Sequence, residues 1–560
     1  MMSETSRRAL GVLLLAPLAV AACGAPTDEA PPDLAVVNAR VWTGDESAPW
    51  AEGLAVRGDR ITTVGDLAAI EALGASRVVD AAGGMVVPGF IDSHVHFVDG
   101  GFRLSSVQLR DAATPEEFSA RIGAFAGTVP PGTWITGGDW DHERWGGELP
   151  VRAWIDELTP GHPVWVNRLD GHMALANSVA LAAAGVDADT EDVEGGEIVR
   201  RADGAPTGVL KDNAMALVDR VVPESPDALE DRALDAAMRY VAEQGVTSVH
   251  AMGSWDDLVT YGRAQDLGRL STRIYAAVPL ESWEQLRDTI AARTYGGDGH
   301  GDTWLQIGML KGFMDGSLGS HTAAFLDDFT DTPGDRGFFL SPPEEIERLV
   351  SMADAAALQV AIHAIGDRAN RTLLDIYERV AIDHGERDRR FRVEHAQHLT
   401  PEDMPRFAAL GVIPSMQPYH AIDDGRWAER VIGPERALGT YAFRSLFESG
   451  ARVAFGSDWF VAPPTPLEGI YAAVTRRTLD DTHPDGWVPD EKIGVEEALR
   501  AYTVNAAYAS FQEASKGRLE PGMLADFAVL DRDLTSIPPT EIRDVRVMMT
   551  VVGGRPVFER

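Results

Sequence analysis

From residue 87 onward, short apolar runs with the character of β-strands alternate with helical stretches, and this rhythm restricts the fold more than any other feature of the chain. Such alternation is typical of βα units that build a parallel sheet. Eight runs are present, as many as a closed (β/α)8 barrel requires. We therefore predict an α/β fold with a TIM barrel over residues 87–511, whose strands are expected at 87–97, 246–252, 273–280, 305–315, 359–365, 391–396, 412–417 and 452–458.

The segments on either side of the predicted barrel have a different pattern. Residues 34–86 and 512–560 contain short runs in which polar and apolar residues alternate between turn residues, as in small antiparallel sheets. Each segment alone has few strands with which to bury a face. We expect the two to complete one small composite β-sandwich. The interval 98–244 is too long for one crossover, so it is predicted to hold an inserted subdomain.

The N-terminus has the pattern of an export signal. Arg7 and Arg8 precede an apolar run over residues 9–22, which is shorter than the roughly 20 residues of a spanning helix and suits a signal peptide. The run ends in VAACG at 20–24, which resembles a bacterial lipobox and makes Cys23 the expected lipidation site. Residues 1–23 are then signal peptide and lipobox, and residues 24–33 are a tether. The alternative is an ordinary signal peptide with an accidental cysteine, and the arginine pair also permits twin-arginine export.

Composition narrows the setting further. Because Cys23 is the one cysteine in 560 residues, no intramolecular disulfide can form. A formal net charge of -36 disfavours nucleic acids and anionic lipids as partners, and its simplest interpretation is solubility. We expect an exported protein, periplasmic or at the cell surface, that contacts a membrane through its lipid anchor only.

Metal-ligand residue types stand at the ends of several predicted strands. His94 and His96, two positions apart on one strand, project from the same face. His363, His395 and Asp458 each end a later strand. A lone histidine at a strand end is more often a core residue, but the joint pattern falls on the face where barrel enzymes build active sites. It predicts a metal centre.

Here the chain resembles the amidohydrolase superfamily. The resemblance covers nearly all of the expected mature chain. Within the superfamily, the chain is similar to the branch that contains N-substituted formamide deformylases. It implies that His94, His96, His363, His395 and Asp458 are metal ligands. The motifs that carry it are VPGFIDSHVH at 87–96, DGH at 170–172, KGFMDGSLGSHTA at 311–323, VEHAQ at 393–397 and GRLEPGMLADFAVLD at 517–531.

Lys311 is one of only four lysines among 50 basic residues, so this chain uses arginine wherever a positive charge suffices. It ends an apolar run, where an unpaired ammonium is unfavourable. A neutral amine can react with carbon dioxide to form a carbamate, and arginine cannot. The resemblance implies that carbamylated Lys311 bridges two divalent ions, expected to be zinc. The alternatives are a lysine paired with Asp315 or another carboxylate, and a site for one ion.

A divalent ion held by neutral imidazoles lowers the pKa of bound water from about 15.7 toward about 7. The resulting hydroxide can attack a carbonyl, and the resemblance implies that Asp458 carries the proton to the departing amine. An amide requires this proton because an amide anion leaves poorly. The expected function is hydrolysis of a non-peptide C–N bond in a small-molecule amide. One activated hydroxide also serves an ester, lactone or phosphoester, and an isomerisation stays open.

Further residues are candidates for the substrate side of the pocket. His172, within the insertion, is a substrate-binding candidate by resemblance, against a structural role at a turn. His420 follows the seventh predicted strand, and its alternative is a loop histidine. Trp134, Trp140 and Trp145 in the insertion can wall an apolar pocket or simply pack. A surface solute-binding lipoprotein is the alternative from another class, but it does not require this set of metal ligands.

Overall fold

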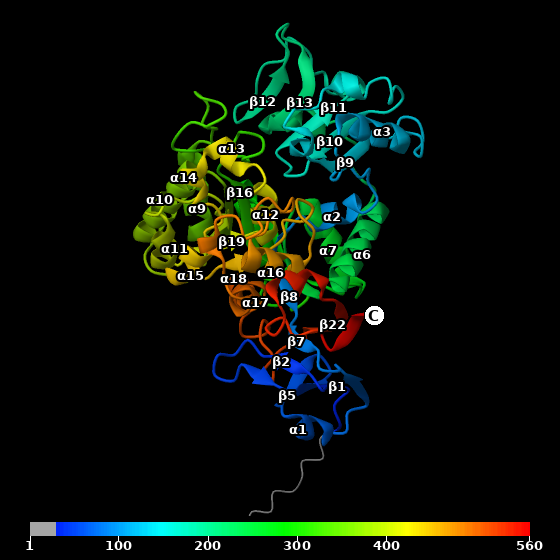
Figure 1. Cartoon of the computed structure of the whole chain (residues 1–560), viewed down its shortest axis with the longest axis vertical. Coiled ribbons are helices and arrows are strands. Elements are labelled where there is room, and N and C mark those ends of the chain that lie inside the picture. The colour runs from blue at the N-terminus through cyan, green and yellow to red at the C-terminus, as the bar shows by residue number, and fades with distance from the viewer. Residues whose placement is uncertain (1–29) are drawn as a thin grey trace, which may run out of the picture.

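The computed structural model describes residues 30–560, and its centre is a barrel of eight parallel strands (Figure 1). This confirms the predicted architecture. Neighbouring strands pair in chain order around one sheet. They are β8 (Phe90–Val95), β14 (Val246–Met252), β15 (Arg273–Pro279), β16 (Leu305–Phe313), β17 (Gln359–Ala364), β18 (Arg392–His395), β19 (Ile413–Met416) and β20 (Ala454–Phe455).

The ring is nearly closed, because single hydrogen bonds, and not a continuous ladder, join β8 and the residue after it to the segment that follows β20. The Asp458 N–H donates to the His94 carbonyl at 2.7 Å, and the His96 N–H donates to the Trp459 carbonyl at 2.6 Å. The Asp92 carboxylate accepts the Ser457 N–H at 2.8 Å. These bonds join the first strand to the segment after the last one, beside the predicted metal ligands.

Both faces of the barrel strands are buried, as expected of a parallel sheet covered by helices. A cluster of Met252, Tyr275, Ala277, Met309 and Ala361 fills the interior. The helices around the outside are α6 (Asp227–Glu243), α7 (Trp255–Asp266), α8 (Trp283–Ala291), α9 (Pro343–Ala355), α10 (Asp367–His384), α11 (Met404–Leu410), α15 (Phe443–Glu448), α16 (Pro466–Thr475), α17 (Val495–Tyr502) and α18 (Val504–Ala509).

Two sheets at one end of the molecule enclose a second core, and one of them combines both ends of the described chain (Figure 1). This confirms the predicted composite arrangement. The six-stranded sheet contains β2 (Arg40–Trp42), β3 (Trp50–Ala51), β7 (Met85–Pro88), β21 (Phe527–Leu530), β22 (Val547–Val552) and β23 (Arg555–Glu559). The four-stranded sheet contains β1 (Leu34–Val37), β4 (Gly53–Arg57), β5 (Arg60–Gly65) and β6 (Arg77–Asp80), with α1 (Leu67–Glu71) beside it.

The strand predicted over residues 87–97 is two strands in two different sheets. β7 belongs to the sandwich and β8 to the barrel, with a break at Gly89. A Cβ atom at Gly89 would lie 2.2 Å from the Thr247 side chain, so the chain passes there only without a side chain.

An inserted five-stranded sheet lies between β8 and β14 in the chain and at the opposite end of the molecule from the sandwich (Figure 1). Apolar clusters cover it on both faces. Its elements are β9 (Ile135–Trp140), β10 (Val164–Arg168), β11 (Met173–Ala176), β12 (Gly196–Arg200) and β13 (Pro206–Asp212), with α3 (Pro115–Ala126), α4 (Ser178–Ala184) and α5 (Ala216–Asp219). Before it, α2 (Phe97–Arg103) packs on α6 of the barrel layer.

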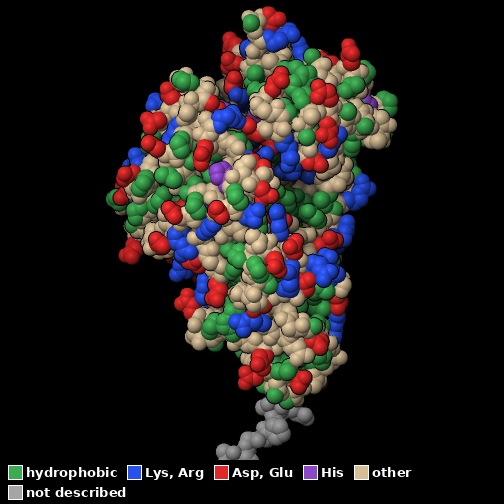
Figure 2. Space-filling model, in the orientation of Figure 1, with side chains coloured by type: hydrophobic (Ala, Val, Ile, Leu, Met, Phe, Trp, Pro, Cys, Tyr) green, Lys and Arg blue, Asp and Glu red, His purple; other side chains and the backbone are tan. Residues whose placement is uncertain are grey.

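The surface carries acidic and basic side chains interspersed over the face shown in Figure 2, without one large patch of a single sign. Within residues 30–560, no helix combines the length and apolar character that crossing a membrane requires. The predicted signal peptide and Cys23 lie outside the described residues, so lipidation stays a prediction.

Candidate metal centre

The six side chains predicted to bind metal lie at one mouth of the barrel, and five of them are fully enclosed while His96, directly after β8, is half-buried. His94 is on β8, Lys311 on β16, His363 on β17 and His395 at the end of β18, while Asp458 follows β20. All five are buried. Lys311 and His363 lie two residues beyond Met309 and Ala361 on their strands, so strand alternation points them to the same barrel interior.

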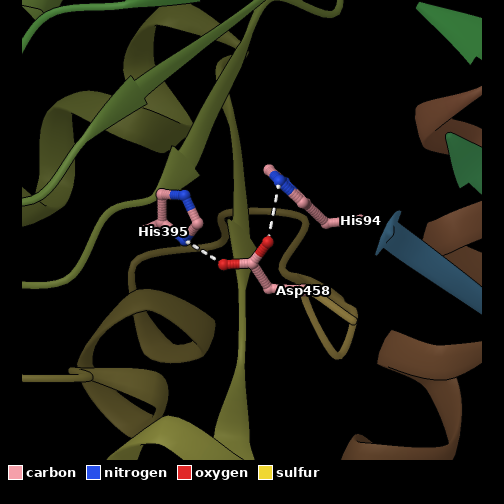
Figure 3. A group of neighbouring side chains, drawn as sticks. All are labelled: His94, His395 and Asp458. Carbon is pink, nitrogen blue, oxygen red and sulfur yellow. Dashed lines mark ion pairs between the residues drawn. The ribbon is translucent and has the colours of Figure 1, made fainter. Parts of the chain in front are cut away.

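The Asp458 carboxylate stands between the imidazoles of His94 and His395, with one oxygen toward each (Figure 3). Its Oδ1 lies 3.3 Å from His94 Nε2 and 3.5 Å from His96 Nε2, and its Oδ2 lies 3.9 Å from His395 Nδ1. Ligand atoms of His94, His395 and Asp458 all fall within 4.8 Å of one another. That spacing suits one divalent ion bound by nitrogen and oxygen donors.

His363 and Lys311 lie beside this group. The His363 ring centroid is 4.6 Å from that of His395, and its Nε2 donates to the Gly316 carbonyl at 3.1 Å, which leaves Nδ1 available as a ligand. Lys311 Nζ lies 3.3 Å from His94 Nε2. Among the described residues, Lys311 has no carboxylate within ion-pair distance. Asp315, the partner considered from the sequence, instead accepts three backbone N–H groups.

Unusual backbone conformations aim two of these side chains. His395 and Ala396 have φ values of 74° and 44°, and Asp458 has a φ of 60°. Non-glycine residues rarely adopt this left-handed region, and such outliers cluster at functional sites. At the end of β18 the unusual φ interrupts the strand's alternation and turns His395 toward the barrel mouth.

Burial keeps the donors in the protonation states that a metal requires. It lowers the pKa values of His94, His363 and His395 well below the usual value, so these imidazoles are neutral at neutral pH. Burial also works to raise the pKa of Asp458, but the neighbouring His94 and His96 outweigh it and hold that pKa below its ordinary range. Asp458 is therefore a carboxylate.

Buried side chains bond the ring nitrogens of two of these histidines. Glu394 Oε2 accepts His94 Nδ1–H at 2.6 Å, and Arg392 Nε pairs with Glu394 Oε1 at 2.7 Å, with all three side chains fully buried. Gln417 Oε1 accepts His395 Nδ1–H at 2.8 Å. The His94 ring thus presents Nε2 to Asp458, whereas the His395 nitrogen nearest to Asp458 is the same Nδ1 that bonds Gln417. Outer partners of this kind orient metal-binding histidines.

The sequence reasoning missed Glu394, Arg392 and Gln417. Arg392 and Glu394 occupy alternate positions of a four-residue strand, so both face the barrel interior. Two opposite charges on the interior face of a predicted core strand were a readable signal, because buried charges require partners. No comparable signal marks Gln417, whose role depends on the neighbouring strand.

The two substrate-binding candidates, His172 and His420, line a cavity together with His363, His395 and Asp458. His172 Nδ1 bonds Asp212 Oδ1 at 2.6 Å. Burial acts to lower the pKa of His172, but this hydrogen bond and the charge of Asp212 reverse the effect and raise it. His420 Nε2 is buried with no hydrogen-bond partner in the described chain, and burial lowers the pKa of this ring.

Two of the three insertion tryptophans named from the sequence pack inside the insertion. The Trp140 indole donates to the Val166 carbonyl at 2.9 Å, and the Trp145 ring packs on Phe118. Trp134 differs from them, because it lines a cavity next to the barrel.

A family profile described as "Amidohydrolase family" matches residues 77–558. The chain belongs to the amidohydrolase family. The resemblance inferred from the motifs is thereby confirmed, and the protein is a metal-dependent hydrolase of that family.

Relatives match over nearly the whole chain. Protein LONG AFTER FAR-RED 3 of Arabidopsis thaliana is 41% identical over 540 residues, which cover 94% of this chain and 91% of the relative. N-substituted formamide deformylase of Arthrobacter pascens is 30% identical over 547 residues, 94% of this chain and 98% of the relative. A metal-dependent hydrolase of Pyrococcus horikoshii superposes with a TM-score of 0.73 at 27% identity, covering 90% of this chain and 99% of its own.

Proposed function

We propose that this amidohydrolase cleaves a non-peptide C–N bond in a small-molecule amide. The observation that carries the proposal is the convergence of buried, neutral imidazoles on the Asp458 carboxylate at the C-terminal mouth of the barrel. Its similarity to a relative named N-substituted formamide deformylase supports the choice of an amide over other substrates.

The residues present fit a divalent ion. Asp458 Oδ1 is buried without a hydrogen-bond partner in the described chain, although it lies 3.3 Å from His94 Nε2. Imidazole nitrogen and carboxylate oxygen together form a donor set that zinc favours. A bound divalent ion supplies a Lewis acid that polarises a carbonyl and lowers the pKa of water.

The protein's own groups then handle binding and proton transfer. Asp458, ionised at neutral pH, can accept a proton from the attacking water and deliver it to the amine nitrogen as the C–N bond breaks. His172 and His420 line the same cavity, and His420 Nε2 has no hydrogen-bond partner among the described residues, so both can bind the amide. Glu394 holds His94 in the tautomer whose Nε2 can bind a metal, and Gln417 orients the His395 ring.

We propose further that Lys311 is carbamylated and bridges two zinc ions, with a single ion as the alternative. Burial lowers the pKa of Lys311 to about 8, so a useful fraction of its amine is neutral near pH 7 and able to react with carbon dioxide. The amine lies 3.3 Å from His94 Nε2, next to the donor set. A carbamate there would add two oxygen donors to the centre.

Elemental analysis of protein prepared with zinc and bicarbonate, together with an amide-hydrolysis screen, tests the proposal. The screen pairs N-acyl and N-formyl amines with matched esters, since the same ligands can serve ester hydrolysis. Asp458→Asn should retain most of its metal and lose turnover, while Asp481→Asn at an exposed site should change neither. Protein without stoichiometric metal, or an Asp458→Asn variant with ordinary rates, would contradict it.

A further inference from the structure

The inserted sheet carries a histidine and an aspartate at the end of one ladder, next to the barrel mouth. His172 directly precedes β11, and Asp212 is the last residue of β13. These strands pair antiparallel with Met173 opposite Lys211, so His172 and Asp212 are the next opposed pair. The Asp212 N–H donates to the His172 carbonyl at 3.0 Å. The backbone of the insertion therefore fixes the two residues relative to each other.

A short hydrogen bond joins the two side chains. His172 Nδ1–H donates to Asp212 Oδ1 at 2.6 Å, and the Asp212 side chain is fully buried. The other ring nitrogen, His172 Nε2, has no hydrogen-bond partner within residues 30–560. The ring lines the cavity that also touches His363, His395 and Asp458. With Nδ1 bound to Asp212, Nε2 is the ring atom left for a ligand in this cavity.

Asp212 has a backbone conformation that glycine adopts far more readily than other residues. Its φ is 46° and its ψ is -127°. A non-glycine residue stays in such a region only where its surroundings hold it, and these residues cluster at functional sites. Gly316, in the segment after β16, packs on the carboxylate, because a Cβ atom there would lie 2.9 Å from Asp212 Oδ1. The strained residue is thus the one that holds His172.

The Asp212 carboxylate serves His172 and no other side chain of the described chain. Its Oδ2 is buried without a hydrogen-bond partner among residues 30–560. The neighbouring Lys211 pairs instead with Glu197, at 2.7 Å. A buried oxygen without a partner is unfavourable, so a carboxylate that only stabilised the fold would be expected to use both of its oxygens. The arrangement favours a role in orienting the imidazole.

The His172 ring lies within reach of a group bound at the predicted ligands. Its centroid is 4.9 Å from that of His363, which in turn lies 4.6 Å from that of His395. The cavity between them measures about 50 Å³, which accommodates a few water molecules or one small group. An amide group in so small a space contacts the His172 ring as well as the ligands.

We propose that Asp212 is a positioning residue, which fixes the His172 imidazole so that its Nε2 hydrogen-bonds the reacting amide group. A buried aspartate that accepts Nδ1–H sets both the orientation and the tautomer of an imidazole. The inserted sheet then takes part in the reaction and does more than enclose the substrate. The inference rests on the proposed amide hydrolysis and adds a residue to its machinery.

A double-mutant cycle tests whether Asp212 acts through His172. In Asp212→Asn the NH2 group can turn toward Nδ1 and move the ring proton to Nε2, so kcat/KM for the amide found in the screen should fall about 10–100-fold, mainly through kcat. His172→Gln should lose at least as much. In the His172→Gln background, Asp212→Asn should cost less than about twofold. The same loss in both backgrounds would show a structural role and overturn the proposal.

A second variant removes the carboxylate without straining the chain. Because a positive φ suits glycine, Asp212→Gly relieves the backbone while it abolishes the bond to His172. It should lose kcat/KM as Asp212→Asn does and retain wild-type zinc content, since neither residue is a predicted ligand. Asp331→Asn is the matched control, because Asp331 bonds His321 at 3.0 Å outside the cavity. Loss of zinc from Asp212→Gly, or an equal loss of kcat/KM in the control, would contradict the role.

Ligand binding separates this proposal from the proposed reaction. If no amide is hydrolysed, amide hydrolysis fails, and the cycle is repeated on the affinity of zinc-loaded protein for acetohydroxamate, a small analogue of an amide that binds zinc. Weaker binding to Asp212→Asn and to His172→Gln, with no further loss in the double variant, supports the positioning role. Absence of binding to the wild type, unchanged binding to Asp212→Asn, or additive losses overturn it.

Discussion

Glu394 touches no predicted substrate atom, yet Glu394→Gln should weaken metal binding. The carboxylate accepts His94 Nδ1–H at 2.6 Å and pairs with Arg392 at 2.7 Å, and the side chains of all three residues are fully buried. A glutamine has one oxygen and one NH2 group in place of two oxygens. If its oxygen faces His94, the NH2 group opposes the Arg392 donors. If its oxygen faces Arg392, the NH2 group favours the His94 tautomer with a proton on Nε2.

The expected effect has two components. Loss of an outer partner of a metal-binding histidine typically reduces metal affinity by about 10–100-fold. Loss of one partner from a buried ion pair destabilises the fold by about 3–5 kcal/mol, because the remaining charge is uncompensated. Zinc affinity is measured by competition with a chromogenic chelator, and stability by urea unfolding of metal-free protein.

The matched control is another buried ion pair, far from the predicted ligands in the chain. Arg273 and Asp526 are 2% and 4% exposed and bond at 2.6 Å. Asp526→Asn should lose stability to a similar degree and keep wild-type zinc affinity. The double variant Arg392→Met, Glu394→Gln should regain part of the stability without regaining zinc affinity. Wild-type zinc affinity in Glu394→Gln would refute the positioning role and leave only a structural one.

Three other predictions follow from single contacts. Lys311→Arg keeps the charge but cannot form a carbamate, so elemental analysis should show zinc falling from two ions to one per chain; two ions in both proteins would contradict the bridge. With the pKa of Lys311 lowered to about 8, its neutral fraction rises about fivefold from pH 7 to pH 8 and then levels, and the rate of zinc-and-bicarbonate reactivation at fixed dissolved carbon dioxide should do the same; a steady tenfold rise per unit through pH 9.5 would indicate an ordinary lysine. Gly456→Ala would place a Cβ atom 2.6 Å from the His94 nitrogen at the barrel seam, so urea unfolding should show a loss of about 1–3 kcal/mol, against little change for Gly127→Ala, where the nearest atom is 3.4 Å away.

Periodicity was sufficient to predict the barrel. Parallel strands are buried on both faces, so each appears as an apolar run, and eight such runs were identified near their observed positions. Periodicity could not divide residues 87–97 between two sheets, because β7 and β8 are both apolar and only one glycine separates them. Gly89 is required there by Thr247, a contact between residues 158 positions apart that no local pattern contains.

The site was predictable where strand ends alone determine it. His94, His363 and Asp458 follow apolar runs, and parallel strands bring their carboxyl ends to one mouth. The orientation of His395 was not predictable, since strict alternation would send Glu394 and His395 to opposite faces. The left-handed φ of 74° at His395 lets both point inward, one as a candidate ligand and the other as support for His94.

The candidate metal ligands and the inserted sheet belong to separate parts of the molecule, so one can vary while the other is preserved. Candidate ligands and their supports are held by barrel strands whose register is fixed by neighbours on both sides, so a shift there displaces several donors at once. Residues of the inserted sheet and of α2, together with Phe460, line a cavity of about 580 Å³ beside the barrel, and the Phe460 ring centroid lies 5.6 Å from that of His96. Substitutions in the insertion can therefore reshape the substrate's surroundings while the metal geometry is preserved. Metal binding should therefore respond to Glu394 variants, whereas Trp134 variants in the insertion should leave zinc affinity unchanged.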